Sequence, residues 1–315
     1  MYELVFNVGS NSYGVQKKPT TVSGSGEQNP PAHPKRPPRR ELCLRRVRNP
    51  RLHCELSSSH QLIYFPYAMG YPNILIFIFQ GTTITMTKQI QDFAAHRSNI
   101  ASRVTAVVAK GLLSKSVFLI SSGGNDVFAF FFGTSGNATA DQIEQFYNVM
   151  ITNYTTHLKA LYDLGARKFA LVNVPPVGCC PISRVRHPLG ACLDGLNGLA
   201  KGFNDRVSAL MKNLSSEMEG MKYTIGNSYN VVMSIVSDPA GVGYKDASSA
   251  CCGSGKLGAE VMCSPNTTYC TNRNEFLFWD RIHPTHATAG KAGFAMYSGA
   301  LEYASPINLK QLVAI

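Results

Sequence analysis

Over the last two thirds of this chain, short apolar segments alternate with long amphipathic ones, and this order limits the fold more than any other feature. The predicted strands are 116–121, 168–174 and 222–226; an amphipathic stretch runs from about 88 to 113, and predicted helices cover 141–164, 193–217, 228–236 and 286–301. Strands that alternate with helices of ten or more residues build parallel sheets covered on both faces. The sequence therefore predicts an α/β fold, a three-layer α/β/α sandwich with a parallel sheet.

A polar, glycine-rich cluster follows the first of these strands. It reads Ser122-Gly123-Gly124-Asn125-Asp126. Such a sequence is typical of an ordinary turn. An Asn at the carboxyl end of a parallel strand, however, faces the crevice where open α/β sheets bind ligands, and its amide can stabilise an oxyanion. The residues alone leave both interpretations open.

A second polar pair, Asp280 and His283, stands just before the last predicted helix. One turn can aim the carboxylate at one imidazole nitrogen, which fixes the tautomer and leaves the other nitrogen as a general base. The spacing alone is weak support, because Asp-x-x-His also occurs at solvated helix starts.

Together these clusters resemble those of the plant GDSL esterase/lipases, in the SGNH hydrolase superfamily. Gly123–Asp126 is similar to the G-x-N-D block of that family, and Asp280–Thr285 to its D-x-x-H-P-T block. Further family-like stretches occur in the family's order at 84–90, 164–168, 174–179, 250–253 and 278–279. The resemblance covers about residues 81–312. It implies a flavodoxin-like SGNH hydrolase fold and cleavage of acyl or lipid esters through an acyl-serine intermediate, with no cofactor and no metal.

The resemblance also assigns roles to single residues. Asn125 is expected to be the oxyanion-hole side chain. His283 is expected to take the proton of the nucleophile and return it to the leaving alcohol, and Asp280 to orient His283. His286, close behind, is interpreted as a residue at the start of the last helix.

The nucleophile of the family is not recognisable in this chain. In the family the nucleophilic serine sits in a Gly-Asp-Ser-Leu turn, and the sequence after this turn is similar to Val8–Tyr13. Leu4 therefore falls where the serine is expected. A leucine has no atom that can attack a carbonyl. The nearest hydroxyls, Ser10 and Ser12, are interpreted as turn residues. We therefore expect an ester hydrolase that is impaired in this chain; the alternative is a catalytically dead, ester-binding homologue or a truncated gene product.

Residues 1–80 are expected to be an irregular or disordered, basic, Pro-rich segment with a remnant of the first family block, and 81–315 the SGNH/GDSL hydrolase domain. Residues 1–60 hold ten Lys and Arg against four Asp and Glu, so six of the eleven net positive charges lie there. Such a run can bind nucleic acid or an anionic surface. Because no interleaved aromatic residues accompany it, the run is interpreted as a solvated tail, and no nucleic-acid partner is expected. The apolar run Ile74–Phe79 is too short to cross a bilayer and is interpreted as a buried strand or as a frame-shifted sequence.

A gene-model or splicing difference would produce the change from an irregular N-terminal segment to a family-like domain.

The chain has nine cysteines, and seven of them cluster in its later loops. No C-x-x-C pairs with a second ligand set, so disulfides in a secreted protein are favoured over a metal site. Sensible local pairs are Cys179 or Cys180 with Cys192, and Cys252 with Cys263. Four glycosylation sequons also suit the secretory pathway; they are at Asn137, Asn153, Asn213 and Asn266. Residues 1–30, however, lack the basic and apolar regions of a signal peptide.

Overall fold

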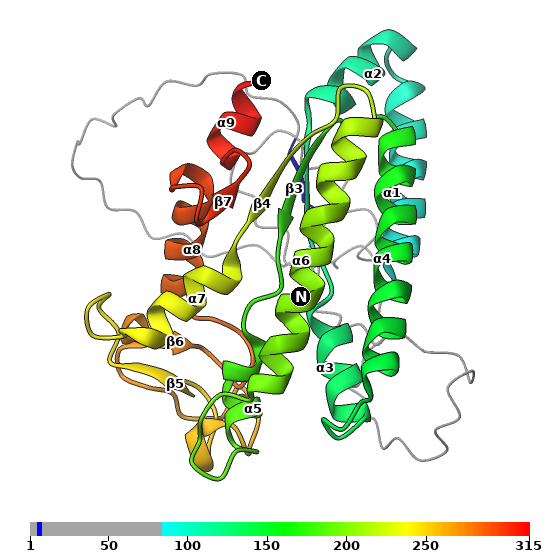
Figure 1. The fold of residues 1–315 in the computed structure, drawn as a ribbon. Helices are drawn as coiled ribbons and strands as arrows, with labels where there is room; N and C mark the ends of the chain where they lie inside the picture. Colours follow the sequence, from blue (N-terminus) through cyan, green and yellow to red (C-terminus); the bar gives the residue numbers. More distant parts are fainter. Residues whose placement is uncertain (1–4, 8–83) are drawn as a thin grey trace, which may run out of the picture. The chain divides into compact units, whose positions relative to one another are not determined.

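The computed structural model describes residues 5–7 and 84–315 (Figure 1). The contacts of the chain divide it into one unit of Met1–Gly9 with Ser59–Ile315 and a second unit, Ser10–Ser58, which lies outside the described residues. The predicted boundary at residue 80, Leu4, the basic run and Ile74–Phe79 also lie outside them.

The centre of the fold is a five-stranded sheet with the order β1-β2-β3-β4-β7. Strands β2 (Val117–Ser121), β3 (Lys168–Val172) and β4 (Lys222–Gly226) are parallel, as predicted, and begin in register. The short outer strands, β1 (Val5–Asn7) and β7 (Ala304–Ser305), are antiparallel to β2 and β4. The sheet is therefore mostly parallel, with an antiparallel strand on either side of its parallel part.

Helices cover both faces of this sheet, which confirms the predicted sandwich (Figure 1). One layer contains α1 (Met86–Ala101), α4 (Ala140–Asp163) and α6 (Asp194–Glu217). The other contains α8 (His286–Ser298) and α9 (Leu309–Ala314). Buried aromatic side chains join strand to helix: the Phe118 ring meets Phe93 of α1 edge-on at 5.4 Å and lies 6.0 Å from Phe169 of β3.

Local signals explain most of the helix ends. Thr139 and Gln142 form a capping box at the start of α4, and Gly165, with φ of 117°, follows its end. The amphipathic stretch predicted from 88 to 113 is two helices, because Thr105 caps the start of α2 (Ala106–Lys115) with its side chain. None of the helices in residues 84–315 is long and apolar enough to cross a membrane.

Several elements were not predicted. Among them are α3 (Gly124–Gly133), which starts inside the glycine-rich cluster, α9, β7, and the strands β5 (Asp246–Ala250) and β6 (Phe276–Phe278). The last two form a separate two-stranded parallel sheet. Helix α5 (Pro181–Arg184), which was also not predicted, follows the carboxyl end of β3, and α7 (Ser228–Ser237), predicted at 228–236, follows the carboxyl end of β4. These additions lie mainly beyond the carboxyl ends of the central strands (Figure 1), so they surround the region where the candidate site residues occur.

Candidate active site

The loop between β6 and α8 carries Asp280 and His283, and hydrogen bonds fix both of its ends. The backbone N–H of Trp279 donates to the carbonyl of His283 at 2.8 Å, which closes the loop on itself. At the helix end, the Thr285 hydroxyl caps α8 and donates to the carbonyl of Phe276 at 2.8 Å. These bonds hold the loop against β6 without using the side chains of Asp280 and His283.

Within this loop Asp280 and His283 are in direct contact. His283 Nδ1 lies 2.7 Å from Asp280 Oδ2. The other carboxylate oxygen, Oδ1, accepts from the backbone N–H groups of Ile282 at 2.8 Å and His283 at 2.7 Å. A carboxylate fixed at both oxygens orients the imidazole, so proton transfer to or from a bound molecule would use the second ring nitrogen, Nε2.

The electrostatics suit an orienting carboxylate. Burial of Asp280 acts to raise its pKa, but the hydrogen bond and charge interaction with His283, together with the two backbone N–H groups, outweigh it and bring the pKa below its ordinary value. Asp280 is therefore ionised at neutral pH. It can hold the imidazole in one orientation and stabilise an imidazolium without taking the proton itself.

Asn125 is the second residue of α3, directly beyond the carboxyl end of β2. The preceding Gly123 has φ of 109°, and a Cβ there would lie 2.3 Å from the Phe203 ring of α6. Only glycine fits both the backbone conformation and the contact. This close approach of the turn to α6 sets the start of α3 and thereby the position of Asn125.

A continuous set of contacts leads from α3 to the loop of Asp280 and His283. Helix α3 packs on α6. The buried side chain of Asn204, on α6, bonds both the N–H and the carbonyl of Val174 at 2.8 Å each, and so fixes the segment after β3. That segment leads into α5, where the N–H of Ile182 donates to the carbonyl of Arg281 at 3.0 Å. Both candidate groups thus belong to one connected region, and their convergence on one crevice stays a prediction.

Sequence reasoning missed this supporting framework. On α6, Asn197 lies two turns before Asn204, and its Oδ1 accepts from the backbone N–H of Gly178 at 2.7 Å. Both side chains are buried on the apolar side of the helix. Two asparagines seven residues apart on an apolar helix face are a signal of buried backbone partners, because polar groups there need hydrogen bonds.

Three disulfides tie the loops around the site. They are Cys179–Cys192, Cys251–Cys270 and Cys252–Cys263. The pair Cys252–Cys263 is as predicted, Cys179 rather than Cys180 bonds Cys192, and Cys251–Cys270 was not anticipated. Among residues 84–315, no group of three or more His, Cys, Asp or Glu side chains could hold a metal ion.

The thiol of Cys180 is buried beneath the loop. Burial, reinforced by the charge of Asp280 and opposed by that of Arg184, raises its pKa to about 12. Its Sγ lies 3.6 Å from the carbonyl oxygen of Ile282, to which it can donate. Cys180 is therefore a packed, protonated thiol and no candidate for a nucleophile, because a nucleophilic cysteine would have to be a thiolate.

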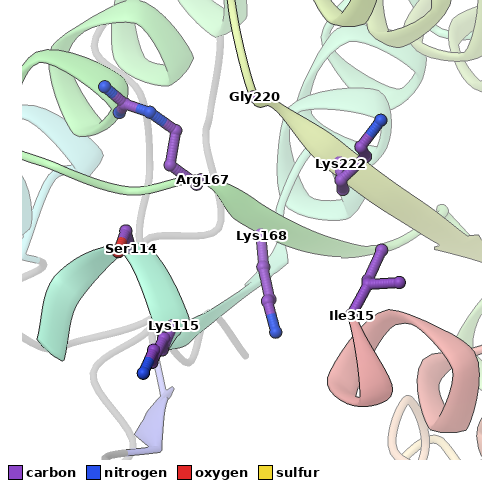
Figure 2. A pocket seen from close by; sticks show the side chains of 7 residues that line it. All are labelled: Ser114, Lys115, Arg167, Lys168, Gly220, Lys222 and Ile315. Carbon is purple, nitrogen blue, oxygen red and sulfur yellow. The ribbon is translucent and has the colours of Figure 1, made fainter. Parts of the chain in front are cut away.

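A cavity of about 330 Å³ lies at the other edge of the sheet, where β3 and β4 begin (Figure 2). Arg167 stacks on the Tyr162 ring at 3.7 Å, and Lys168 Nζ donates to the carbonyl of Val313 at 3.3 Å. Figure 2 shows Arg167 and Lys222 extending to one side of the strands and Lys168 and Lys115 to the other. The cationic side chains that line this cavity therefore do not converge on one point.

Comparison with known proteins agrees with these features. The family model for GDSL-like Lipase/Acylhydrolase matches residues 62–293, which include Asn125, Asp280 and His283. GDSL esterase/lipase At5g55050 of Arabidopsis thaliana is 33% identical over 237 residues, covering 74% of this chain and 62% of that protein. At2g42990 of the same plant is 31% identical over 209 residues, covering 65% and 59%. This chain thus spans less than two thirds of the length of these relatives. By its family match and this identity, the chain belongs to the GDSL-like lipase/acylhydrolase family.

Proposed function

We propose that this domain carries the acid–base and oxyanion groups for hydrolysis of acyl or lipid esters. The observation that supports it best is the contact of 2.7 Å between His283 Nδ1 and Asp280 Oδ2, in a carboxylate whose other oxygen is fixed by two backbone N–H groups. An imidazole oriented in this way is suited to take a proton from a hydroxyl nucleophile through Nε2.

The proposed reaction follows from these positions. A serine hydroxyl attacks the ester carbonyl while His283 Nε2 takes its proton, and the charge that develops on the carbonyl oxygen is stabilised by the Asn125 side-chain amide. His283 then gives the proton to the leaving alcohol, and an acyl-serine remains. Water, deprotonated by His283, then hydrolyses the acyl-serine, and His283 returns the proton to the serine, which regenerates the serine hydroxyl and the neutral imidazole. Asp280 stays ionised throughout.

We further propose that the chain as it stands is impaired, because the serine is missing. Leu4 occupies the position that the family resemblance gives to the nucleophile, and the family match begins only at residue 62. Val5, which the resemblance would put in the nucleophile turn, instead pairs with Leu119 in the antiparallel strand β1. A homologue that binds esters without cleaving them is the second candidate, and the same three observations favour it.

The proposed setting is the secretory pathway. Three disulfides among the described residues suit an oxidising compartment. The four sequon asparagines are all exposed, so each is accessible for glycosylation; they are Asn137, Asn153, Asn213 and Asn266.

A serine-directed fluorophosphonate tests the missing nucleophile. We expect the purified chain to remain unlabelled and to hydrolyse a short acyl ester no faster than a His283→Ala variant does, because an oriented base has no hydroxyl to activate. Intact mass measurement after incubation with the probe checks the first point, and initial rates check the second. Stoichiometric labelling of Ser10, Ser12 or any other serine would show that the chain is an ordinary serine esterase.

A further inference from the structure

Two disulfide-closed segments flank the loop of Asp280 and His283. The first, 179–192, bonds the loop through the Ile182 N–H and the carbonyl of Arg281. The second, 251–270, bonds it through the N–H of Cys252 and the carbonyl of Trp279, at 2.7 Å. The two segments are also joined to each other, because Lys256 Nζ donates to the carbonyls of residues 187 and 188 at 3.1 and 3.3 Å. We call these two segments the rim.

The rim exposes large apolar side chains. Leu189 is 90% exposed, and Val261, Met262 and Tyr269 are each 57% exposed. Exposed apolar patches mark sites of interaction with proteins or membranes, and the Lys256 bonds bring together the two segments that carry these side chains. Here the disulfides and the Lys256 bonds hold the backbone that carries them.

Basic side chains accompany these apolar ones. Arg186 is exposed three residues before Leu189, and its guanidinium lies 4.5 Å from the centre of the Phe132 ring. Lys256 is also exposed. So is Arg273, three residues beyond the second segment, whose guanidinium lies 5.1 Å from the centre of the Tyr269 ring. Glu260 provides one opposing charge within the second segment. The rim and the adjoining Arg273 therefore combine apolar side chains with an excess of positive charge.

We propose that the rim docks on an anionic lipid surface. Leu189, Val261 and Met262 enter the boundary between head groups and acyl chains, while Arg186 and Arg273 contact lipid phosphates and carboxylates. Apolar burial and attraction to anionic lipids together drive interfacial binding of this kind. The proposal deepens and rests on the proposed ester hydrolysis, because docking would present membrane esters to the loop that the rim surrounds.

Vesicle sedimentation tests the docking without any need for catalysis. The full chain with its disulfides intact is mixed with vesicles of phosphatidylcholine, with or without phosphatidylserine. We expect binding to the anionic vesicles, and binding that weakens between about 0.1 M and 1 M NaCl, since the Debye length falls from roughly 10 Å to 3 Å. Leu189→Ser should weaken binding about tenfold, because the side chain no longer gains from apolar burial.

Val107→Ser is the matched control. Val107 is 81% exposed on α2, which lies before the amino end of β2 and outside the rim. The Val107→Ser variant should bind vesicles as well as the unaltered chain does, and melting curves should show that both variants are folded. Lack of binding to anionic vesicles, equal binding to neutral ones, or equal losses in the two variants would overturn the docking proposal. None of these results depends on the presence of a nucleophile, so they are separable from a failure of the proposed hydrolysis.

Discussion

Hydrolysis of a short acyl ester is expected to rise by at least about 10³-fold when residues 1–61 are replaced by a segment that carries the family's Gly-Asp-Ser-Leu turn and the strand before it. The graft supplies the Gly-Asp-Ser-Leu turn and its strand, and with them the hydroxyl that an oriented His283 can deprotonate. Loss of the nucleophile lowers the rate nearly as much as loss of all the catalytic residues together, so restoring the nucleophile should recover most of the rate. Initial rates of the grafted and unaltered chains, measured side by side, check this result.

Two variants of the grafted chain serve as controls. The same graft with alanine in place of the serine of its turn keeps the added strand but lacks the hydroxyl, and it should show no gain. His283→Ala in the active graft should remove the gain as well, because nucleophile and base act as one unit. A gain that survives His283→Ala would mean that this imidazole is not the base.

Asn125→Ala in the grafted chain is expected to lower kcat by about 10²–10³-fold, with a much smaller change in KM. The reason is that an oxyanion donor bonds the charge that develops in the transition state more strongly than it bonds the ground-state carbonyl. Steady-state kinetics separate the two constants. Asn148→Ala, at an exposed position on α4, is the matched control and should leave both constants unchanged. If Asn125→Ala instead raised KM by about 10²–10³-fold at unchanged kcat, Asn125 would be a substrate-binding residue.

The central strands could be predicted from sequence because their signals are local. Residues 117–121 and 222–226 differ by at most one residue from the predicted strands, since apolar and β-branched residues favour strands wherever they are buried. The start of α3 could not be predicted. Gly123 and Gly124 read as a turn, and helix begins at Gly124 only because Gly123 packs against Phe203, about 80 positions further along the chain.

A similar limit applies to β5. Its sequence, Asp-Ala-Ser-Ser-Ala, has no apolar alternation and becomes a strand by pairing with β6, which is distant in sequence. The orientation of β1 is equally non-local, because its antiparallel pairing with β2 joins residues as far apart in the chain as Val5 and Leu119. Pairing partners set these elements, and a single sequence does not reveal them.

The same distinction divides the candidate site. Asp280 and His283 are three residues apart, so one turn of backbone suffices to join them, and the sequence predicts the pair. The supporting contacts depend on residues far apart in the chain: Asn204 bonds Val174, and Ile182 bonds the carbonyl of Arg281. Their partners are backbone groups, which every residue has, so no residue type in the sequence marks them. For that reason the contact between Asp280 and His283 could be predicted, and the framework that places it could not.

The measurement that tests this account most directly is a crystal structure of the grafted chain after reaction with the fluorophosphonate. The account predicts a phosphonate on the grafted serine, with His283 Nε2 near the serine oxygen and Asn125 Nδ2 at about 3 Å from a phosphonyl oxygen, because oxyanion donor and base must serve one tetrahedral centre. Asn125 more than about 15 Å from His283 in that structure would contradict the account, since groups so far apart cannot act on one carbonyl.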